Sequence, residues 1–206
     1  MSPKESDKAY PFDMRIIAGQ FRSRTLRTSA DSTRTRPTTD RARETLFNIL
    51  TNLVDWDGLR VLDLYAGSGA LGIEALSRGA AFAECVERDR HAIDAMSENI
   101  RTLGITARAK IHRRDVQTFL KQPIASQFEL VLADPPYEDE WAQQHLATEC
   151  LASGILPVAG LLVIEHRSTG EPPKTIAALE LLRTAVAGEA AFSIYRHLDP
   201  NSEPHE

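Results

Sequence analysis

Short apolar runs alternate with amphipathic stretches from Arg60 to Glu165, and this alternation restricts the fold more than any other feature of the chain. The apolar runs predict five strands, at residues 60–66, 82–87, 109–112, 128–133 and 160–165. The stretches between them predict helices at residues 71–78, 90–103, 116–121 and 140–152. Apolar strands that alternate with helices are typical of a parallel sheet covered on both faces. The sequence therefore predicts a doubly wound α/β fold.

The two ends of the chain depart from this alternation. Residues 179–198 predict two strands joined at Gly188-Glu189, an antiparallel hairpin that brings the sheet to about seven strands. Thr39 is a predicted helix N-cap, with Asp40 in the first turn. The helix that follows carries an apolar stripe of Leu46, Ile49, Leu50 and Leu53. Residues 14–28 alternate apolar and basic residues and predict a short β hairpin or an extended arm.

These elements divide the chain into four parts. Residues 1–13 are polar and are expected to be flexible, and residues 14–38 form a basic N-terminal arm. Residues 39–198 form the main α/β domain, and residues 199–206 are expected to be a flexible tail. A length of 206 residues fits one domain with a small extension.

Composition excludes several classes of protein. With 42% hydrophobic and 26% charged residues, the chain is typical of a globular protein. No apolar run reaches the roughly 20 residues of a membrane span, and the N-terminus lacks a signal-peptide core, so we expect a cytoplasmic protein. Cys85 and Cys150 lie in apolar surroundings and are expected to be buried thiols of a reducing compartment. The 6 histidines lack metal-ligand spacing, so no metal site is expected.

The first predicted strand leads into a glycine-rich turn, DLYAGSGALG, at residues 63–72. The turn contains G-x-G-x-x-G, and Glu87 follows Gly67 by 20 positions, as in a dinucleotide-binding site. In such a site the helix N-terminus receives a pyrophosphate, which nearby acids would repel. The acids around this turn therefore discriminate between a nicotinamide cofactor and another adenosine cofactor.

Three acids follow three successive predicted strands. Asp63 suits a cation such as an amino group, Glu87 can accept both hydrogen bonds of a ribose diol, and Asp115 can accept from an adenine amino group. Together they favour S-adenosylmethionine, a cation with an amino acid at one end. The structural alternatives are that Asp63 caps a turn, that Asp115 caps a helix, and that the glycines serve packing alone. The predicted cofactor site is completed by Ala66, Gly67, Ser68, Gly69, Arg88 and Val116.

The segment FELVLADPPYEDE ends the fourth predicted strand with Asp134, Pro135, Pro136 and Tyr137. Two prolines after a buried strand fix the backbone, and a rigid strand terminator is the structural alternative. The same residues suit methylation of an exocyclic amine on a base. Asp134 and the Pro135 carbonyl can accept its N–H groups, and an extruded base can stack on Tyr137. We expect these four residues to be catalytic, without a metal or a covalent enzyme intermediate.

These motifs resemble those of class I S-adenosylmethionine-dependent amino-methyltransferases, and most closely those of the RsmD family. The resemblance covers about residues 14–198 and rests on RIIAGQFRSR, RPTTDRARETLFN, LDLYAGSGALGIEALSRGA, VERD and ADPPY. It implies a Rossmann-like methyltransferase domain over residues 39–198, with S-adenosylmethionine as cofactor. It also implies that the target is N2 of a guanine in 16S rRNA, the guanine called 966. Ser23 is a departure, because relatives often have glycine at this position.

The arm carries a concentration of positive charge that the rest of the chain lacks. Residues 14–43 contain eight arginines and two acids, a local charge of +6 in a chain of net charge -5. Such arginines suit phosphate contacts that orient RNA, and a solvated charged face is the structural alternative. The predicted RNA-binding residues are Arg15, Arg22, Arg24, Arg36, Arg41 and Arg43. The resemblance implies 16S rRNA in a partly assembled small ribosomal subunit as partner, and a monomer is the simpler expectation.

Three other functions are compatible with part of these features. A DNA adenine-N6 or cytosine-N4 methyltransferase would use the same Asp-Pro-Pro-Tyr motif, but only about 50 residues lie outside the core for sequence recognition. A nicotinamide-dependent oxidoreductase would fit the G-x-G-x-x-G turn and leave the other motifs unexplained. A non-catalytic RNA-binding or assembly factor would share the fold, yet both motifs are intact here.

Overall fold

The computed structural model describes residues 14–28, 39–123 and 126–199. Within these ranges the strands are β1 (Met14–Arg15), β2 (Thr25–Leu26), β3 (Arg60–Leu64), β4 (Phe82–Glu87), β5 (Ala109–Arg113), β6 (Leu130–Ala133), β7 (Leu161–Arg167), β8 (Thr175–Ile176), β9 (Leu179–Ala187) and β10 (Ala190–His197). The helices are α1 (Asp40–Leu50), α2 (Ala70–Arg78), α3 (Arg90–Leu103), α4 (Val116–Leu120) and α5 (Glu140–Ala152), with a 3-10 turn at Thr106–Arg108. Residues 1–13 and 29–38, and the tail from residue 200, lie outside the described residues, so the flexibility predicted for both ends is untested.

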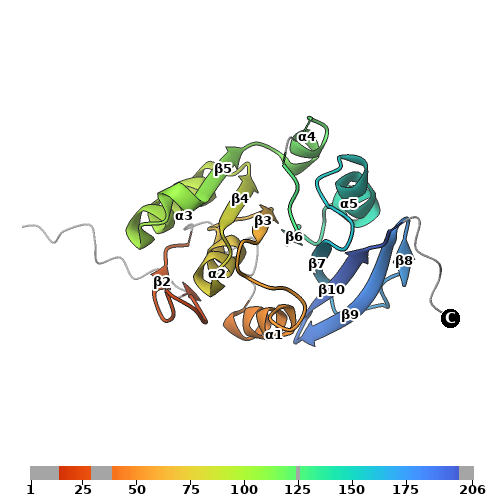
Figure 1. The fold of residues 1–206 in the computed structure, drawn as a ribbon, viewed down its shortest axis with the longest axis horizontal. Helices are drawn as coiled ribbons and strands as arrows, with labels where there is room; N and C mark the ends of the chain where they lie inside the picture. Colours follow the sequence, from red (N-terminus) through yellow and green to blue (C-terminus); the bar gives the residue numbers. More distant parts are fainter. Residues whose placement is uncertain (1–13, 29–38, 124–125, 200–206) are drawn as a thin grey trace, which may run out of the picture.

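One sheet in the order β5-β4-β3-β6-β7-β10-β9-β8 forms the centre of the described fold (Figure 1). Strands β3 to β7 pair in parallel, and β10 runs antiparallel to β7 and β9. The seven predicted strands are present, including the hairpin that turns at residues 188–189. The two-residue strand β8 is an addition that the sequence did not predict, because so short a segment has no periodic pattern. β1 and β2 pair with each other separately, as the hairpin prediction required.

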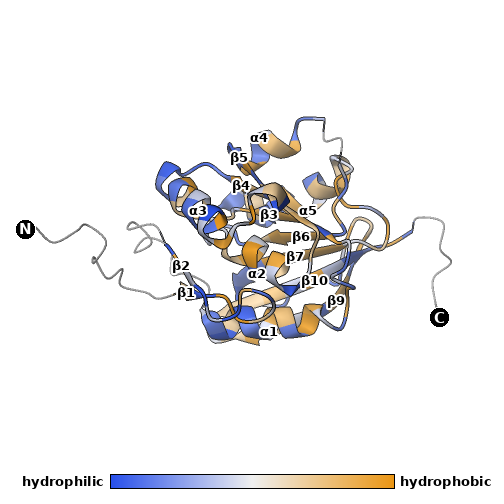
Figure 2. Ribbon diagram, turned by 60° about the vertical axis from the view of Figure 1, so that its left-hand side comes forward, coloured by the Kyte–Doolittle hydropathy of each residue, from blue (hydrophilic) through white to orange (hydrophobic). Residues whose placement is uncertain are grey.

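Each side of the sheet has its own hydrophobic cluster. On β3, Val61 belongs to the cluster beneath α1, α2 and α3, whereas Leu62 and Leu64 belong to the cluster beneath α4 and α5. Figure 1 shows these two groups of helices on either side of the sheet, and Figure 2 shows the hydrophobic colours of β6 and β7. Both faces of the parallel strands are therefore buried, which explains why these segments are apolar throughout.

Helix α1 begins where its capping residue predicts. The hydroxyl of Thr39 accepts the backbone N–H of Ala42 at 3.2 Å, which satisfies one of the free donors of the first turn. Leu46 and Leu50 are completely buried. The helix ends at Leu50, so Leu53 of the predicted stripe lies beyond it and packs on the same cluster from the following turn.

A buried carboxylate docks the arm hairpin on α2. Glu74 has no exposed surface and accepts the backbone N–H groups of Ile17 at 2.8 Å and Ala18 at 3.1 Å. Arg78 donates its Nε–H to the same carboxylate at 2.8 Å. The apolar side chains of the hairpin belong to the cluster beneath α1, α2 and α3: Met14, Ile16, Phe21 and Leu26. The hairpin therefore shares its core with the main domain.

Two residues of the hairpin have left-handed backbone conformations. Gly19 has a φ of 81°, and a Cβ there would lie 1.9 Å from the carbonyl oxygen of Ser77, so the close approach to α2 requires glycine. Ser23 has a φ of 68°. It thus adopts the conformation that glycine favours, at the position where the family resemblance predicts glycine. The serine keeps the backbone path at a cost of roughly 1–2 kcal/mol.

Asn99 of α3 connects the arm to the glycine-rich turn. Its Oδ1 accepts the backbone N–H of Arg27 at 2.7 Å. Its Nδ2 donates to the carbonyl oxygens of Arg27 and Ser68, both at 3.0 Å. One side chain therefore fixes the end of the hairpin relative to the turn.

Candidate functional site

A cleft of about 1110 Å³ opens at the carboxyl ends of the parallel strands. The strand order reverses between β3 and β6, where Leu64 pairs with Ala133, and ligands of doubly wound sheets bind beyond such a reversal. The residues predicted from the sequence that line it are Arg41, Arg43, Asp63, Ala66, Gly67, Ser68, Glu87, Arg88, Asp115, Val116, Asp134, Pro135, Pro136 and Tyr137. The predicted crevice is therefore present, and it brings the two main motifs together.

Four neighbouring strands, β4, β3, β6 and β7, carry an acid at or just beyond their carboxyl ends, on one face of the sheet. The acids are Glu87, Asp63, Asp134 and Glu165. The residue before each acid packs in the cluster beneath α4 and α5: Val86, Leu62, Ala133 and Ile164. Successive residues of a strand face opposite sides, so the acids face the side of α2. One wall of the cleft is therefore acidic.

Asp63 is 1% exposed and combines one satisfied with one unsatisfied oxygen. Its Oδ2 accepts the backbone N–H of Gly72 at 2.8 Å, whereas Oδ1 has no hydrogen-bond partner among the described residues. Burial, together with the nearby charges of Asp134 and Glu87, raises the pKa of Asp63 to about 7 despite the bond from Gly72. A buried acid with an unsatisfied oxygen in a cleft suits a cationic donor such as an ammonium group.

Glu87 and Asp115 also hold the loops around the cleft. Glu87 accepts the backbone N–H of Gly67 at 2.9 Å. It also accepts the backbone N–H groups of Arg88 at 2.7 Å and Asp89 at 2.8 Å. Asp115 caps α4 through the N–H of Thr118 at 3.2 Å and pairs with Arg88 at 3.2 Å. The helix cap predicted as the structural alternative for Asp115 is therefore present. Both carboxylates still line the cleft, where their oxygens have further acceptor capacity.

The glycines of the turn have different surroundings. Gly67 lines the cleft, but Gly69, which was also predicted to bind the cofactor, does not. Gly69 has a φ of 82°, and a Cβ there would lie 2.7 Å from Cγ of Met96. A Cβ at Gly72 would lie 3.2 Å from Oδ2 of Asp63. Two of the three glycines of G-x-G-x-x-G therefore serve close packing, and the cofactor contact of Gly69 stays a prediction.

The Asp134–Tyr137 segment leaves the sheet at the end of β6. Asp134 still donates its backbone N–H to Leu64 at 3.4 Å, and the prolines that follow end the ladder. The hydroxyl of Tyr137 donates to Glu165 at 3.4 Å, and the guanidinium of Arg167 lies 4.7 Å from the centre of its ring. Burial, followed by the charges of Glu165 and Asp134, raises the pKa of Tyr137 to about 12. Tyr137 is therefore a neutral phenol near neutral pH.

The arginines predicted to bind RNA do not form one group. Arg36 lies outside the described residues, whereas the side chains of four others are exposed: Arg15, Arg22, Arg24 and Arg41. Arg43 differs from these four, because it is 1% exposed and donates to the carbonyl of Arg15 and to Asp40. Its Nε and Nη1 have no hydrogen-bond partner among the described residues, and it lines the cleft. A buried guanidinium at this position suits an anionic group inside the cleft and not a phosphate on an open surface.

Three residues that were not predicted from the sequence also line the cleft: Tyr65, Glu165 and Arg167. Tyr65 has a φ of 61°, uncommon for a residue other than glycine, and its hydroxyl donates to Asp139 at 3.2 Å. Burial, followed by the charge of Asp139, raises the pKa of Tyr65. A signal for Glu165 was present, because it follows an apolar run as Asp63 does. The contacts of Tyr65 and Arg167 join separate elements and have no local pattern.

The tip of the β9–β10 hairpin is a further missed part of the cleft wall. Gly188 and Glu189 line the cleft because Ala190 pairs with Arg167, which brings the tip to the carboxyl end of β7. The sequence predicted this turn but gave no signal that it would reach the site.

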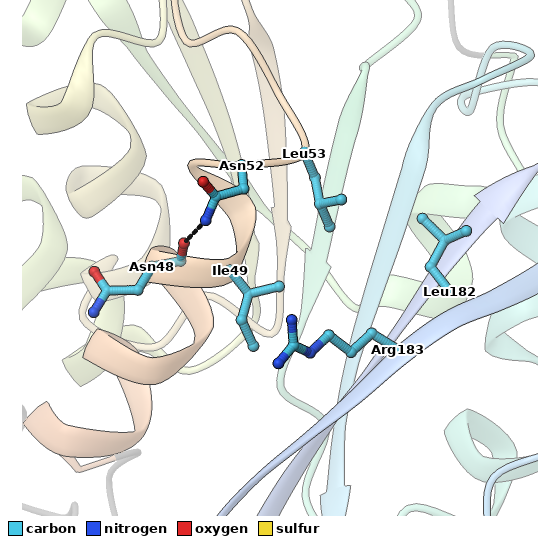
Figure 3. A pocket seen from close by; sticks show the side chains of 6 residues that line it. All are labelled: Asn48, Ile49, Asn52, Leu53, Leu182 and Arg183. Carbon is cyan, nitrogen blue, oxygen red and sulfur yellow. Dashed lines mark hydrogen bonds between the residues drawn. The ribbon is translucent and has the colours of Figure 1, made fainter.

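A second pocket, of about 490 Å³, lies between α1 and β9 (Figure 3). Its walls are Asn48, Ile49, Asn52, Leu53, Leu182 and Arg183. Figure 3 shows the Asn52 amide bonded to the carbonyl of Asn48, at 2.9 Å, and the guanidinium of Arg183 close to Ile49. None of the site residues predicted from the sequence lies in this pocket, so the larger cleft is the candidate site.

Three further findings concern the cysteines, metal-binding groups and membrane-spanning helices. Cys85 and Cys150 are free and buried, as expected. Within the described residues, no group of three or more His, Cys, Asp or Glu side chains could hold a metal ion. The same part of the chain contains no helix that is both long enough and apolar enough to cross a membrane.

The sequence of this chain matches a known family of proteins. Residues 14–196 match the family described as Conserved hypothetical protein 95, which is the RsmD family. The chain belongs to the RsmD family. The class I methyltransferase fold predicted from the sequence is confirmed.

Relatives of this RsmD-family protein match it over most of its length. "Ribosomal RNA small subunit methyltransferase D" of Escherichia coli (strain K12) is 37% identical over 183 residues, 89% of each chain. "Putative rRNA methyltransferase YlbH" of Bacillus subtilis (strain 168) is 37% identical over 185 residues, 89% of this chain and 98% of the other. The solved structure "Putative methyltransferase yhhF" from Escherichia coli superposes with a TM-score of 0.79 at 35% identity, covering 91% of this chain and 99% of that one.

The cofactor predicted from the sequence for this RsmD-family protein is S-adenosylmethionine, and its relatives are named methyltransferases. The described residues fit the chemistry of its amino-acid end, which carries an ammonium and a carboxylate. The cleft contains a buried acid with an unsatisfied oxygen, Asp63, and a buried guanidinium with unsatisfied N–H groups, Arg43. The buried acid Asp63, which accepts the backbone N–H of Gly72 at the start of α2, would repel a pyrophosphate at this helix N-terminus.

Proposed function

We propose that this protein methylates the exocyclic N2 amine of a guanine in 16S rRNA, the guanine called 966, with S-adenosylmethionine as the methyl donor. The observation that carries the proposal is the presence of the Asp134–Tyr137 segment and the buried acid Asp63 in one cleft. The relative of this chain named ribosomal RNA small subunit methyltransferase D supports rRNA as the substrate.

Two buried groups of opposite charge would hold the amino-acid end of the cofactor. Asp63 Oδ1 would accept from the ammonium, and Arg43 Nε and Nη1 would donate to the carboxylate. Both lie near the glycine-rich turn: Arg43 bonds the carbonyl of Arg15, and the neighbouring Met14 contacts Ser68 of the turn at 3.9 Å. When bound, S-adenosylmethionine supplies a methyl group activated by a positively charged sulfur.

The adenosine end of the cofactor would lie along the ends of β4 and β5. Glu87 would accept from the ribose hydroxyls, and Asp115 would accept from the adenine amino group. Arg88 and Val116 would complete the wall, because both line the cleft beside these acids.

At the end of β6, Asp134 and the carbonyl of Pro135 would accept the two N–H groups of the target amine. These contacts orient the nitrogen and stabilise the positive charge that develops as its lone pair forms the N–C bond, while the methyl–sulfur bond breaks and its electron pair stays on the sulfur. Asp134 then accepts the proton that the nitrogen loses and passes it to water. Tyr137, a neutral phenol, would stack on the base. The rigid prolines keep this geometry, so positioning supplies most of the rate enhancement.

The exposed arginines of the arm would contact RNA phosphates and orient the substrate. Arg22 and Arg24 lie in the β1–β2 hairpin, which is fixed to α2. Arg15 and Arg41 are also proposed to contact RNA, and so is Arg36, which lies outside the described residues. We also propose that the substrate is a partly assembled small ribosomal subunit. The enzyme is proposed to be a monomer in the cytoplasm.

Nucleoside mass spectrometry tests the proposed function directly. The purified protein and methyl-labelled S-adenosylmethionine are incubated in parallel with free 16S rRNA, with small ribosomal subunits from a strain lacking this protein, and with DNA. We expect labelled N2-methylguanosine, with subunits as the better substrate. Labelled N6-methyladenine or N4-methylcytosine in the DNA sample would instead indicate the DNA methyltransferase alternative.

A further inference from the structure

We propose that Glu165 determines the base specificity of the enzyme by accepting the N1–H of the target guanine, beside the amine held by Asp134. This inference rests on the proposed function and deepens it. It names the group by which the site distinguishes guanine from other bases that carry an exocyclic amine.

The strand register places the two acids side by side. In the parallel pair β6–β7, Ala133 is opposite Ile164, so Asp134 follows this pair just beyond the end of β6 and Glu165 follows it within β7. Neighbouring strands lie roughly 4.8 Å apart, and both acids face the side of α2. A planar base that presents its amine to Asp134 would therefore present the adjacent ring position to Glu165.

Contacts with Tyr137 fix Glu165 at the base end of the cleft. The Tyr137 hydroxyl donates to Glu165 Oε1 at 3.4 Å. Arg167, two residues further along β7, covers the Tyr137 ring with its guanidinium, 4.7 Å from the ring centre. The side chain proposed to stack on the base is thus held by the carboxylate proposed to recognise its edge.

Burial makes this carboxylate selective. Glu165 is only 5% exposed, yet it lines the cleft. A base that enters the cleft displaces water from it, and a buried acceptor that then faces another acceptor has an unfavourable free energy. A base with a donor at the matching position avoids this cost.

The edge of guanine supplies such donors and the edges of the other amino bases do not. Guanine carries one N–H at N1 and two at N2, three donors in a row. Adenine and cytosine also carry an exocyclic amine, but the neighbouring ring nitrogen of each is an acceptor. An ionised carboxylate only accepts hydrogen bonds. Asp134, the Pro135 carbonyl and Glu165 therefore match guanine, and Glu165 opposes adenine and cytosine.

The experiment compares guanine with 2-aminopurine, which keeps the amine at position 2 but has an acceptor at N1. Small-subunit rRNA carrying either base at the methylated position is reconstituted with small-subunit proteins, and kcat/KM is measured for wild type and Glu165→Gln. Wild type should prefer guanine by at least about 10²-fold, because a buried hydrogen-bonding site strongly rejects an analogue that lacks the partner. The amide can donate as well as accept, so Glu165→Gln should methylate 2-aminopurine faster than wild type does and reduce the preference to below about tenfold.

The outcomes separate this inference from the proposed function. If wild type produces no N2-methylguanosine, the proposed function fails. If wild type methylates guanine but shows no preference over 2-aminopurine, or if Glu165→Gln lowers both rates equally, Glu165 does not read the base and the inference is overturned.

A second variant guards against loss of folding. Glu165→Asp keeps the negative charge, so it should retain the preference for guanine even if kcat falls. Thermal unfolding and S-adenosylmethionine binding are measured for both variants. If Glu165→Gln does not fold, retained preference in Glu165→Asp together with the wild-type preference supports the inference, and loss of preference in Glu165→Asp contradicts it.

Discussion

The carboxylate of Glu74 accepts the backbone N–H of Ile17 at 2.8 Å, which joins the arm hairpin to α2. Helix α2 also begins at the glycine-rich turn, since Gly69 is its N-cap. One helix therefore positions both the arm, where RNA contacts are proposed, and the turn beside the cofactor cleft. The arm is part of the site's framework and not an appendage to it.

Replacing Glu74 should therefore destabilise the whole domain. Glu74→Ala leaves two backbone N–H groups and the guanidinium of Arg78 without their acceptor, and should lower the free energy of unfolding by about 3–5 kcal/mol. Urea unfolding measures this change. Glu98→Ala, which removes an exposed acid paired with Arg101, is the control and should leave the midpoint nearly unchanged. Equal effects of the two variants would contradict the docking role.

Cofactor binding should depend on pH through Asp63. Its pKa of about 7 lies above the ordinary 3.8, so between these values the folded protein holds a proton that the unfolded chain releases. The cofactor-free protein should therefore lose stability as pH rises from about 4 to about 7. An ammonium group requires the ionised acid, so affinity for S-adenosylmethionine should increase roughly tenfold per pH unit below 7 and then level off.

Isothermal titration calorimetry between about pH 5.5 and about pH 8 measures the pH dependence of cofactor binding. Asp63→Asn should bind more weakly and without this pH dependence, because the amide does not titrate. The same pH slope in wild type and Asp63→Asn would show that another group is responsible.

Arg43 should affect cofactor binding and not RNA binding. Arg43→Gln removes the guanidinium proposed to hold the cofactor's carboxylate, and affinity for S-adenosylmethionine should fall by about 10- to 100-fold. Decarboxylated S-adenosylmethionine, which lacks that carboxylate, should bind wild type and Arg43→Gln alike. Arg41→Gln is the matched control, because Arg41 lies in the same helical turn and is exposed. If Arg43→Gln loses affinity for RNA and keeps its affinity for S-adenosylmethionine, Arg43 binds RNA and not the cofactor.

Asp134 should be required for methyl transfer but not for cofactor binding. Asp134→Ala removes an acceptor for the target amine, and kcat should fall by at least about 10²-fold. Affinity for S-adenosylmethionine should stay within a few-fold of wild type. Glu171→Ala removes an exposed acid outside the cleft, and its activity should be close to wild type. Near-normal turnover of Asp134→Ala would overturn the catalytic assignment.

The arm arginines should contribute to RNA affinity without affecting the cofactor. Arg22→Ala with Arg24→Ala should weaken RNA binding and lower the slope of log K against log salt concentration by about 2. Lys121→Ala with Arg183→Ala removes the same charge from exposed positions outside the arm and serves as the control. Lost cofactor affinity in the arm variant, or equal RNA effects in both variants, would contradict the proposal.

The parallel sheet was predictable because its strands are apolar on both faces and its helices carry capping residues. Thr39, Asp89, Asp115 and Asp139 each cap the helix that follows, so the beginnings of α1, α3, α4 and α5 are encoded locally. Strand β8 was not predicted because a strand of two residues is too short to show a periodic hydrophobic pattern. The sequence could not indicate that the hairpin around Gly19 would dock on Ser77, since that contact joins residues far apart in the chain.

Candidate site residues could be predicted from the sequence where they directly follow a strand. They could not be predicted where a contact between distant parts of the chain determines their position. Asp63 and Asp134 could be expected to line one cleft because the carboxyl ends of parallel strands meet at one edge. The packing of Gly69 against Met96 could not be predicted, because a glycine that makes room for a side chain has the same sequence pattern as one that approaches a ligand. Arg43 was grouped with the exposed arginines because a charge count contains no information about burial.

The docked hairpin also has a consequence for synthesis of the chain. Its partners Glu74, Ser77 and Asn99 lie 56 to 72 residues further along the sequence. At translation rates of about 5–20 residues per second, the hairpin leaves the ribosome several seconds before the groups that bind it. Met14, Ile16, Phe21 and Leu26 meet water during this interval and enter the core only afterwards. The first described segment to be made is thus among the last to be buried, and a nascent chain paused before Asn99 would expose it to chaperones.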